Sequence, residues 1–165
     1  MLRDQQISES QAGASATADR PLRIALLSYR SKAHSGGQGI YVRHLSRELA
    51  ALGHHVEVIS GPPYPELDEG PSLTKVPSLD LYREPDPFRV PKLREFRSPI
   101  DVYEFLSVCT GSFPEPLTFS LRARRLLENR PAAERPDIVH DNQTLGYGML
   151  FMDRPGMPVV ATIHH

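Results

Sequence analysis

Hydrophobic residues change their spacing along this chain, and the changes predict alternating strands and helices. Residues 22–28, LRIALLS, form a nearly continuous apolar run, which is typical of a strand buried on both faces of a parallel sheet. From Gly39 onward, apolar residues recur at helical spacing: Val42, Leu45, Leu49 and Leu52. Gly53 follows them as the expected C-cap, and residues 56–60, VEVIS, form a second strand. This succession predicts a βαβ unit with a right-handed crossover.

Residues 61–99 interrupt the alternation. They hold nine of the sixteen prolines, and their apolar residues are scattered. A regular helix cannot run through so many prolines, so the segment is expected to be a long irregular insertion. Such an insertion is either a binding loop or a surface excursion, and the sequence leaves both interpretations open.

The alternation resumes after the insertion. Residues 99–111 and 115–130 have helical patterns, and residues 136–142, PDIVHDN, indicate a short parallel strand. Residues 144–154 indicate a short, poorly formed helix, and residues 157–164, MPVVATIH, a last β-branched strand. The pattern predicts an α/β fold: a doubly wound, Rossmann-like domain with a mainly parallel sheet.

Composition narrows the class of protein. The 165 residues are 39% hydrophobic and 24% charged, and their formal net charge is −1. These values exclude a membrane span and a wholly disordered chain, and they give no strong field for nucleic acid. Residues 1–20 are expected to be a disordered tail without the apolar core of a signal peptide. The predicted location is cytoplasmic, and composition leaves peripheral attachment to a membrane open.

Two local features have structural interpretations. Cys109 is the single cysteine, so no internal disulfide can form, and its apolar surroundings predict a small buried residue. The basic run of residues 122–125 lies among leucines at helical spacing. We interpret it as the solvated face of a helix rather than a binding patch.

The glycine-rich loop before the first helix is the first candidate site. It follows the carboxyl end of the first strand, where open α/β sheets bind ligands. Glycine allows close approach of a ligand, and the helix N-terminus offers free N–H groups and partial positive charge, so the loop can seat a phosphate or another polar ligand. The dinucleotide fingerprint is broken, because Val42 stands where a third small residue belongs. A turn needed only for chain geometry is the alternative.

The second candidate site is the end of the last strand. His164 and His165 stand where a doubly wound fold places ligands, and Asp141 and Asn142 end the preceding strand. Imidazole can transfer a proton or bind a substrate hydroxyl. A zinc site including His140 lacks any supporting ligand motif, so no metal is predicted.

Three motifs resemble one known family. They are HSGGQGIYVRHLSRELAALGHHVEVIS, RPDIVHDNQTLGYG and MPVVATIHH, and they follow one another in the family's order over residues 22–165. Together they are similar to the opening of family-4 glycosyltransferases, retaining enzymes with two Rossmann-like domains, called GT-B. The resemblance implies that residues 21–165 are the N-terminal, acceptor-side domain, incomplete at its C-terminus, with the insertion at residues 61–99.

The resemblance also implies roles for individual residues. His164 matches the family's histidine that contacts the donor sugar and supports catalysis, and His165 is its neighbour. Gly36 and Gly37, with Gln38 beside them, match the loop near the donor diphosphate and the acceptor. Asp141 and Asn142 are implied as acceptor-side contacts, and the position of the Pro-rich span suggests that it helps to select the acceptor.

The family's donor-binding domain has no counterpart in the sequence. No glutamate pair with the family's E-x7-E spacing occurs among these residues. The implied activity is transfer of a sugar from a nucleoside diphosphate sugar to an acceptor hydroxyl with retention and without cofactor or metal. It should require the missing C-terminal domain, so the chain alone should be inactive. The residues by themselves leave two alternatives, an NAD(P)-binding oxidoreductase domain and a non-catalytic α/β interaction module.

Overall fold

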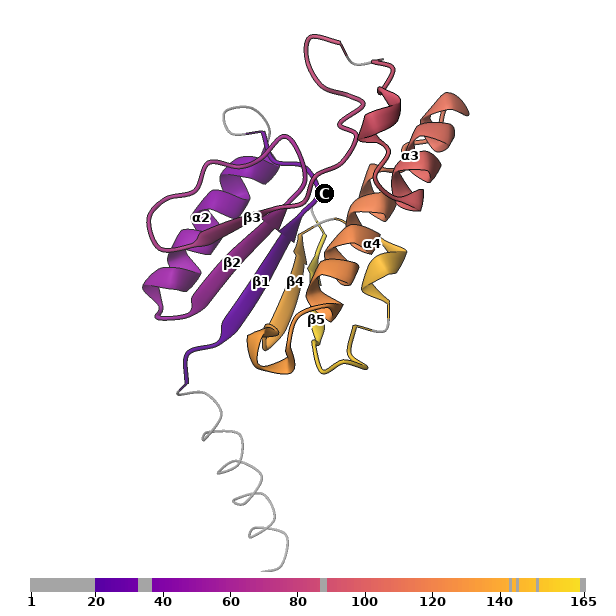
Figure 1. Cartoon of the computed structure of the whole chain (residues 1–165). Helices are drawn as coiled ribbons and strands as arrows, with labels where there is room; N and C mark the ends of the chain where they lie inside the picture. The colour runs from indigo at the N-terminus through magenta and orange to yellow at the C-terminus, as the bar shows by residue number, and fades with distance from the viewer. Residues whose placement is uncertain are drawn as a thin grey trace, which may run out of the picture.

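The protein has a central sheet with helices on both faces (Figure 1). The computed structural model describes residues 20–32, 37–86, 89–142, 144, 146–150 and 152–163. The elements follow in the order β1 (Arg23–Ser28), α2 (Gly37–Ala51), β2 (His55–Ser60), β3 (Ser72–Lys75), the 3-10 helix η1 (Leu93–Glu95), α3 (Pro99–Cys109), α4 (Glu115–Glu128), η2 (Ala132–Glu134), β4 (Ile138–Asn142), η3 (Tyr147–Met149) and β5 (Val159–Thr162). The predicted tail lies outside these residues except for Arg20, which forms an ion pair with Asp137.

The strands form a parallel sheet in the order β3-β2-β1-β4-β5. β1 lies in the middle, and all of its residues after Arg23 are buried, as its continuous apolar run predicted. The chain leaves β1 towards one edge of the sheet and later returns to the other side of β1, which is the doubly wound topology expected from the sequence.

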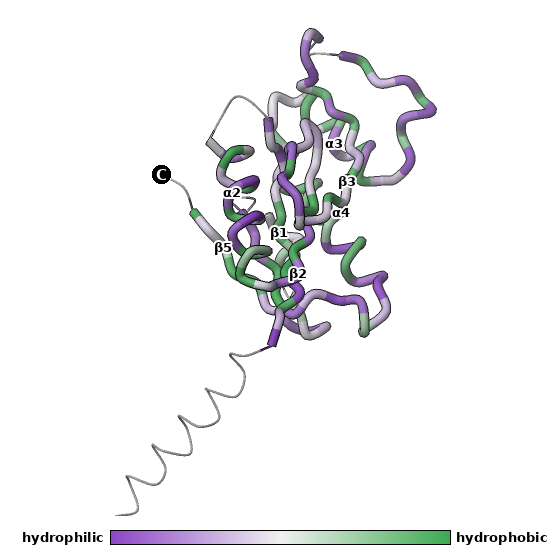
Figure 2. Tube along the Cα trace, turned by 90° about the vertical axis from the view of Figure 1, so that its left-hand side faces the viewer, coloured by the Kyte–Doolittle hydropathy of each residue, from purple (hydrophilic) through white to green (hydrophobic). Residues whose placement is uncertain are grey.

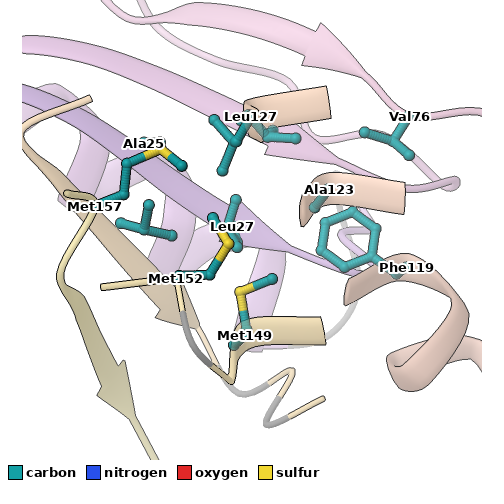
Figure 3. Close-up of a cluster of buried hydrophobic side chains, with 11 residues drawn as sticks. Ala25, Leu27, Val76, Phe119, Ala123, Leu127, Met149, Met152 and Met157 are labelled. Atoms are coloured by element: carbon teal, nitrogen blue, oxygen red, sulfur yellow. The ribbon is translucent and has the colours of Figure 1, made fainter. Parts of the chain in front are cut away.

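The larger part of the core lies between the sheet and α4. Figure 3 shows Phe119, Ala123 and Leu127 of α4 facing Ala25 and Leu27 of β1. Three methionines, Met149, Met152 and Met157, complete this cluster from the segment between β4 and β5. Methionine is flexible enough to fill the irregular space beside the 3-10 turn of that segment.

The other face of the sheet is covered by α2. Val42 packs on Leu26 and Val58, and hydrophobic and hydrophilic residues alternate around the helix in Figure 2. The helix ends at Ala51 and is capped, as predicted, by Gly53, whose φ of 91° belongs to the left-handed region that favours glycine. The His54 N–H donates to the Leu49 carbonyl at 3.2 Å, which is the pairing of a Schellman C-cap.

The segment from residue 61 to residue 99 is less irregular than the sequence predicted. It contains β3, which extends the sheet beyond β2 with Val58 opposite Leu73, and the short helix η1. The rest of its described residues are loop. In the described part of the chain, no helix combines the length and apolarity needed to cross a membrane.

Helix α3 corrects two expectations. Cys109, predicted to be buried, is exposed at the end of this helix. Arg122, predicted to be solvated, has a side chain only 10% exposed and forms ion pairs with Asp101 and Glu104 of α3. The fully buried residues of α3 are these two carboxylates, whereas Val102, Tyr103, Leu106 and Cys109 are exposed.

Candidate functional site at the carboxyl edge of the sheet

The glycine turn, defined here as Gly37–Gly39 at the start of α2, and the end of β4 meet at the carboxyl edge of the sheet. Gly37 begins α2, and the side-chain amide of Gln38 donates a hydrogen bond of 3.2 Å to the backbone oxygen of Asn142, the last residue of β4. The structure therefore brings together two parts of the predicted site that lie more than a hundred residues apart. This bond gives Gln38 a positioning role, which the sequence did not indicate.

The glycines of the turn differ in their surroundings. A Cβ atom at Gly39 would lie 2.2 Å from the carbonyl oxygen of Lys32, so the chain leaving β1 crosses the first turn of α2 at a distance that only glycine allows. No described residue lies within 4 Å of the position that a Cβ atom would take at Gly37. Gly39 is thus required by the fold, whereas the described part of the chain sets no such requirement at Gly37.

The loop that follows β1 is fixed by buried polar contacts. The hydroxyl groups of Ser28 and Ser31 lie 2.6 Å apart, and the Ser31 N–H donates to the Pro63 carbonyl at 2.9 Å. The loops after β1 and β2 are therefore joined behind the glycine turn. The first turn of α2 carries no acidic residue, so no carboxylate there opposes an anionic ligand.

The predicted acceptor contacts at the end of β4 are buried. Asp141 is 1% exposed and Asn142 fully buried, and the Asp141 carboxylate accepts a hydrogen bond of 3.2 Å from the Thr144 N–H. The Thr144 hydroxyl is also buried, and it has no hydrogen-bond partner within the described residues. Asp141 shapes the turn after β4, and a direct contact of Asp141 or Asn142 with substrate stays a prediction.

The end of β5 lies beside the end of β4. Asn142 is opposite Thr162 in the sheet, and the Thr162 hydroxyl is 2.7 Å from Nε2 of His140. The chain after Thr162 therefore leaves the sheet at the same edge as the glycine turn. Gly36, His164 and His165 lie outside the described residues, and their roles remain predictions.

A second polar group lies at this edge and was not predicted from the sequence. Arg30, two residues after β1, forms an ion pair of 3.1 Å with Glu115 in the first turn of α4, and its guanidinium also donates to the Tyr82 carbonyl at 3.3 Å. Burial raises the pKa of Glu115, against the lowering effect of Arg30. The contact of Arg30 with Tyr82 holds part of the Pro-rich segment against the edge. The signal in the sequence was a charged residue two positions after a buried strand.

A cavity of about 430 Å³ lies elsewhere, between the end of β3 and helices α3 and α4. Its lining includes Lys75, Arg97 and Arg125 but none of the predicted site residues. Among the described residues, no three His, Cys, Asp or Glu side chains are grouped in a way that could hold a metal ion. The prediction that the protein needs no metal is not tested by this observation.

Comparison with known proteins identifies the family. The sequence model of the glycosyl transferase 4-like domain matches residues 36–165. The MMP alpha-(1->4)-mannosyltransferase of Mycolicibacterium hassiacum is 64% identical over 145 residues, which cover 87% of this chain. The chain spans 35% of the length of that curated relative. Among solved structures, the calicheamicin glycosyltransferase CalG4 aligns with 86% of this chain and 32% of its own, with a TM-score of 0.48 and 20% identity.

These findings confirm the predicted resemblance. They do not favour the oxidoreductase alternative, and the geometry opposes it as well. A dinucleotide-binding domain places an acidic ribose ligand at the end of its second strand. Glu57 lies within β2 instead, and both terminal nitrogens of Arg130 hold its carboxylate at 2.6 Å. Because the family's model matches well over half of the chain, the chain belongs to the glycosyl transferase 4-like domain family.

Proposed function

We propose that this domain is the acceptor-side half of a retaining mannosyltransferase. The donor is a nucleoside diphosphate mannose, and the acceptor is a hydroxyl group of a glycan. The observation that carries the proposal is the 64% identity to a relative named as an alpha-(1->4)-mannosyltransferase. The glycine turn, fixed between β1 and β4 with open space at Gly37, is the feature of this chain that fits such a substrate.

The N-terminus of α2 can stabilise negative charge. A helix of fifteen residues directs free N–H groups and a partial positive charge towards the glycine turn. In sugar transfer the leaving diphosphate gains charge as the glycosidic bond breaks, and fixed N–H donors favour that change. Gln38 and Gly39 keep the turn in place, and Gly37 leaves room for the ligand.

His164, in the stretch that follows β5, is proposed as the catalytic residue. It follows Thr162, the end of β5, by two residues, and Thr162 is fixed beside β4. A histidine there can donate a hydrogen bond to a hydroxyl of the donor sugar or hold a proton during transfer. His165 is its neighbour and the second candidate.

Retention of configuration follows from the proposed substrates. If the donor carries mannose in the α configuration and the product linkage is α, the anomeric configuration is the same before and after transfer. The leaving diphosphate and the acceptor hydroxyl then exchange on one face of the sugar. The donor-binding residues of such an enzyme would come from a second domain.

The test uses the Mycolicibacterium hassiacum protein with its matched segment replaced by this chain. The hybrid is expected to transfer mannose from a nucleoside diphosphate mannose to an α(1→4)-mannooligosaccharide, and nuclear magnetic resonance of the product should show an α linkage. The single His164→Ala change should lower kcat by about 100-fold or more, the usual range for a lost proton-transfer group. A folded hybrid that transfers no mannose, or gives a β linkage, contradicts the proposal.

The two glycines provide a matched pair in the same hybrid. Gly37→Ala should leave the melting temperature unchanged, because its Cβ meets open space, but should raise KM or lower kcat. Gly39→Ala should lower the melting temperature as well, because its Cβ overlaps the Lys32 carbonyl. Unchanged kinetics in Gly37→Ala would mean that the substrate does not approach this turn.

Two further expectations concern conditions. The 165-residue chain alone should show no transfer with any nucleoside diphosphate sugar, because the donor site is incomplete. A chelator should leave the activity of the hybrid unchanged. Turnover by the chain alone, or activity lost to chelation and restored by Mg²⁺, would contradict these expectations.

A further inference from the structure

Three aromatic side chains gather on the α4 side of the carboxyl edge. Tyr29 directly follows β1, Tyr82 belongs to the Pro-rich segment, and Phe113 precedes α4. The ring centroids of Tyr82 and Phe113 are 5.5 Å apart, and those of Tyr29 and Phe113 are 6.5 Å apart at an interplanar angle of 76°. We call these three residues the aromatic cluster.

The aromatic cluster is not a closed part of the core. Phe113 is 52% exposed, although Tyr29 and Tyr82 already pack against its ring. Tyr29 only borders the core cluster beneath α4. Exposure of an aromatic surface to water is unfavourable in free energy, and a ligand that covers it removes this cost.

Fixed polar groups surround these rings. The Arg30 guanidinium lies 5.9 Å from the centroid of the Tyr82 ring and is held there by Glu115. The Tyr29 and Tyr82 hydroxyl groups are protonated at neutral pH, as in any tyrosine of ordinary pKa, and burial raises the pKa of both further, so they can donate hydrogen bonds. A ligand on this surface would therefore meet both ring faces and hydrogen-bonding groups.

The cluster is physically continuous with the glycine turn. Arg30 and Lys32 lie on the stretch that leads from Tyr29 to the turn, and Lys32 forms an ion pair of 2.7 Å with Glu84, two residues after Tyr82. The Lys32 carbonyl lies against Gly39. The same short piece of chain thus fixes the aromatic cluster at one end and the first turn of α2 at the other.

We propose that Tyr29, Tyr82 and Phe113 form a subsite for the inner sugar residues of the acceptor glycan, whose terminal hydroxyl lies at the glycine turn; this rests on the proposed function. The C–H groups on the face of a pyranose ring are apolar and weakly positive, and they complement the negative face of an aromatic ring. Hydroxyl groups at the edge of the sugar pair with Arg30 and the tyrosine hydroxyls. Acceptors long enough to reach the cluster bind more tightly than short ones.

The test measures binding of α(1→4)-mannooligosaccharides of two to six residues to the 165-residue chain by calorimetry and by shifts of the aromatic resonances. Longer oligosaccharides should bind more tightly than the disaccharide. Phe113→Leu should remove this gain, weakening the longest ligand by about tenfold, the size of one lost aromatic contact. The disaccharide should bind Phe113→Leu as it binds the unchanged chain.

Phe105→Leu is the matched control. Phe105 packs on Phe96, with centroids 5.7 Å apart, and neither ring belongs to the aromatic cluster. This variant should keep the full dependence on glycan length. Thermal melting of both variants checks that each is folded, and if Phe113→Leu unfolds, Tyr82→Leu serves in its place, with the same loss expected.

The failure of this proposal differs from failure of the proposed function. If the hybrid enzyme transfers mannose but glycan length has no effect on binding, or Phe113→Leu keeps the length effect, the subsite is wrong and the function stands. If binding depends on length and on Phe113 but the hybrid transfers no mannose, the subsite stands and the enzyme assignment is wrong. A changed oligomeric state or vesicle binding in Phe113→Leu, with glycan binding intact, assigns the rings to a different partner and overturns the subsite.

Discussion

Two glutamate–arginine pairs of the same chemistry lie in very different surroundings. Glu57 of β2 is held by both terminal nitrogens of Arg130, and the two side chains are 22% and 21% exposed. Glu104 of α3 is bonded to Arg122 of α4, and its side chain is only 1% exposed. Arg122 also pairs with Asp101 at 2.6 Å, so one guanidinium serves two carboxylates.

The two glutamates respond to their surroundings with opposite pKa shifts. Burial tends to raise the pKa of Glu57, but hydrogen bonds from Arg130 and Thr74 outweigh it, and the pKa falls below its ordinary value. At Glu104 burial is the larger effect and raises the pKa despite Arg122, with Asp101 adding a repulsive charge. An arginine partner therefore favours the ionised form of a carboxylate only where its attraction exceeds the cost of removing the carboxylate from water.

Helices α3 and α4 are attached to the rest of the fold in different ways. α4 buries apolar residues on the sheet, whereas α3 is attached to α4 through its two acids and Arg122. Three apolar residues of α3, Val102, Tyr103 and Leu106, are left exposed, and none of its apolar residues is fully buried. We expect α3 to depend on this charge cluster much more than α4 depends on any ion pair.

The largest expected effect comes from removing the shared arginine. Arg122→Leu leaves two buried carboxylates without their cation, and it should lower the free energy of unfolding by about 3–5 kcal/mol. Arg124→Leu, two residues further along α4, removes a pair with Glu128 and an exposed hydrogen bond to the Leu150 carbonyl, and it should cost about 1 kcal/mol. Urea unfolding measures both, and equal losses would show that burial does not separate them.

Removing both members of the buried pair should cost less than removing Arg122 alone. In Glu104→Leu with Arg122→Leu, the apolar side chains replace two desolvated charges. A double-mutant cycle in urea should give a coupling of about 2 kcal/mol between the two positions. Strictly additive losses would mean that Asp101, not Glu104, is the partner that matters to Arg122.

The smallest expected effect concerns pH, and its sign differs between the pairs. The folded pKa of Glu57 lies below its ordinary 4.5, so its contribution is present above pH 4.5 and is lost as the pH falls through the folded value. Glu57→Gln should therefore be less stable than the unchanged chain at pH 6, by about 1 kcal/mol, and approach it in acid.

Glu104→Gln provides the opposite case. The folded pKa of Glu104 lies above its ordinary 4.5, so its contribution is full below pH 4.5 and is lost as the pH rises through the folded value. The stability of Glu104→Gln relative to the unchanged chain should therefore improve between pH 4 and pH 7. Unfolding free energies of both variants over this range check the signs, and parallel curves would contradict the comparison.

The sequence predicted those parts of the fold that local patterns determine. β1 is marked by its continuous apolar run, and α2 is marked by its helical spacing and its capping Gly53. Each pattern lies within the segment that it identifies. β3 was missed because SLTK is short, lies at the edge of the sheet and has no fully buried residue. β3 is held by backbone pairing with β2, and backbone pairing requires no particular pattern of apolar side chains in β3.

The wrong expectations for Cys109 and Arg122 have a common cause. A helix with apolar residues is assumed to bury them, but α3 packs against an arginine of another helix and buries its acids instead. That choice depends on a partner twenty residues away in the sequence. That the start of α2 and the end of β4 meet at the strand ends was predictable from topology. The bond from Gln38 to β4 and the contacts of Arg30 and Thr144 needed the folded chain.

The single thiol of the chain has a practical consequence. Cys109 is the only cysteine, and it stands exposed at the last residue of α3, four residues before Phe113. A fluorophore or nitroxide attached there would label one position without any engineering of the sequence. Its emission or mobility would then report whether α3 loosens when the charge on Glu104 changes and whether a glycan settles on the nearby rings.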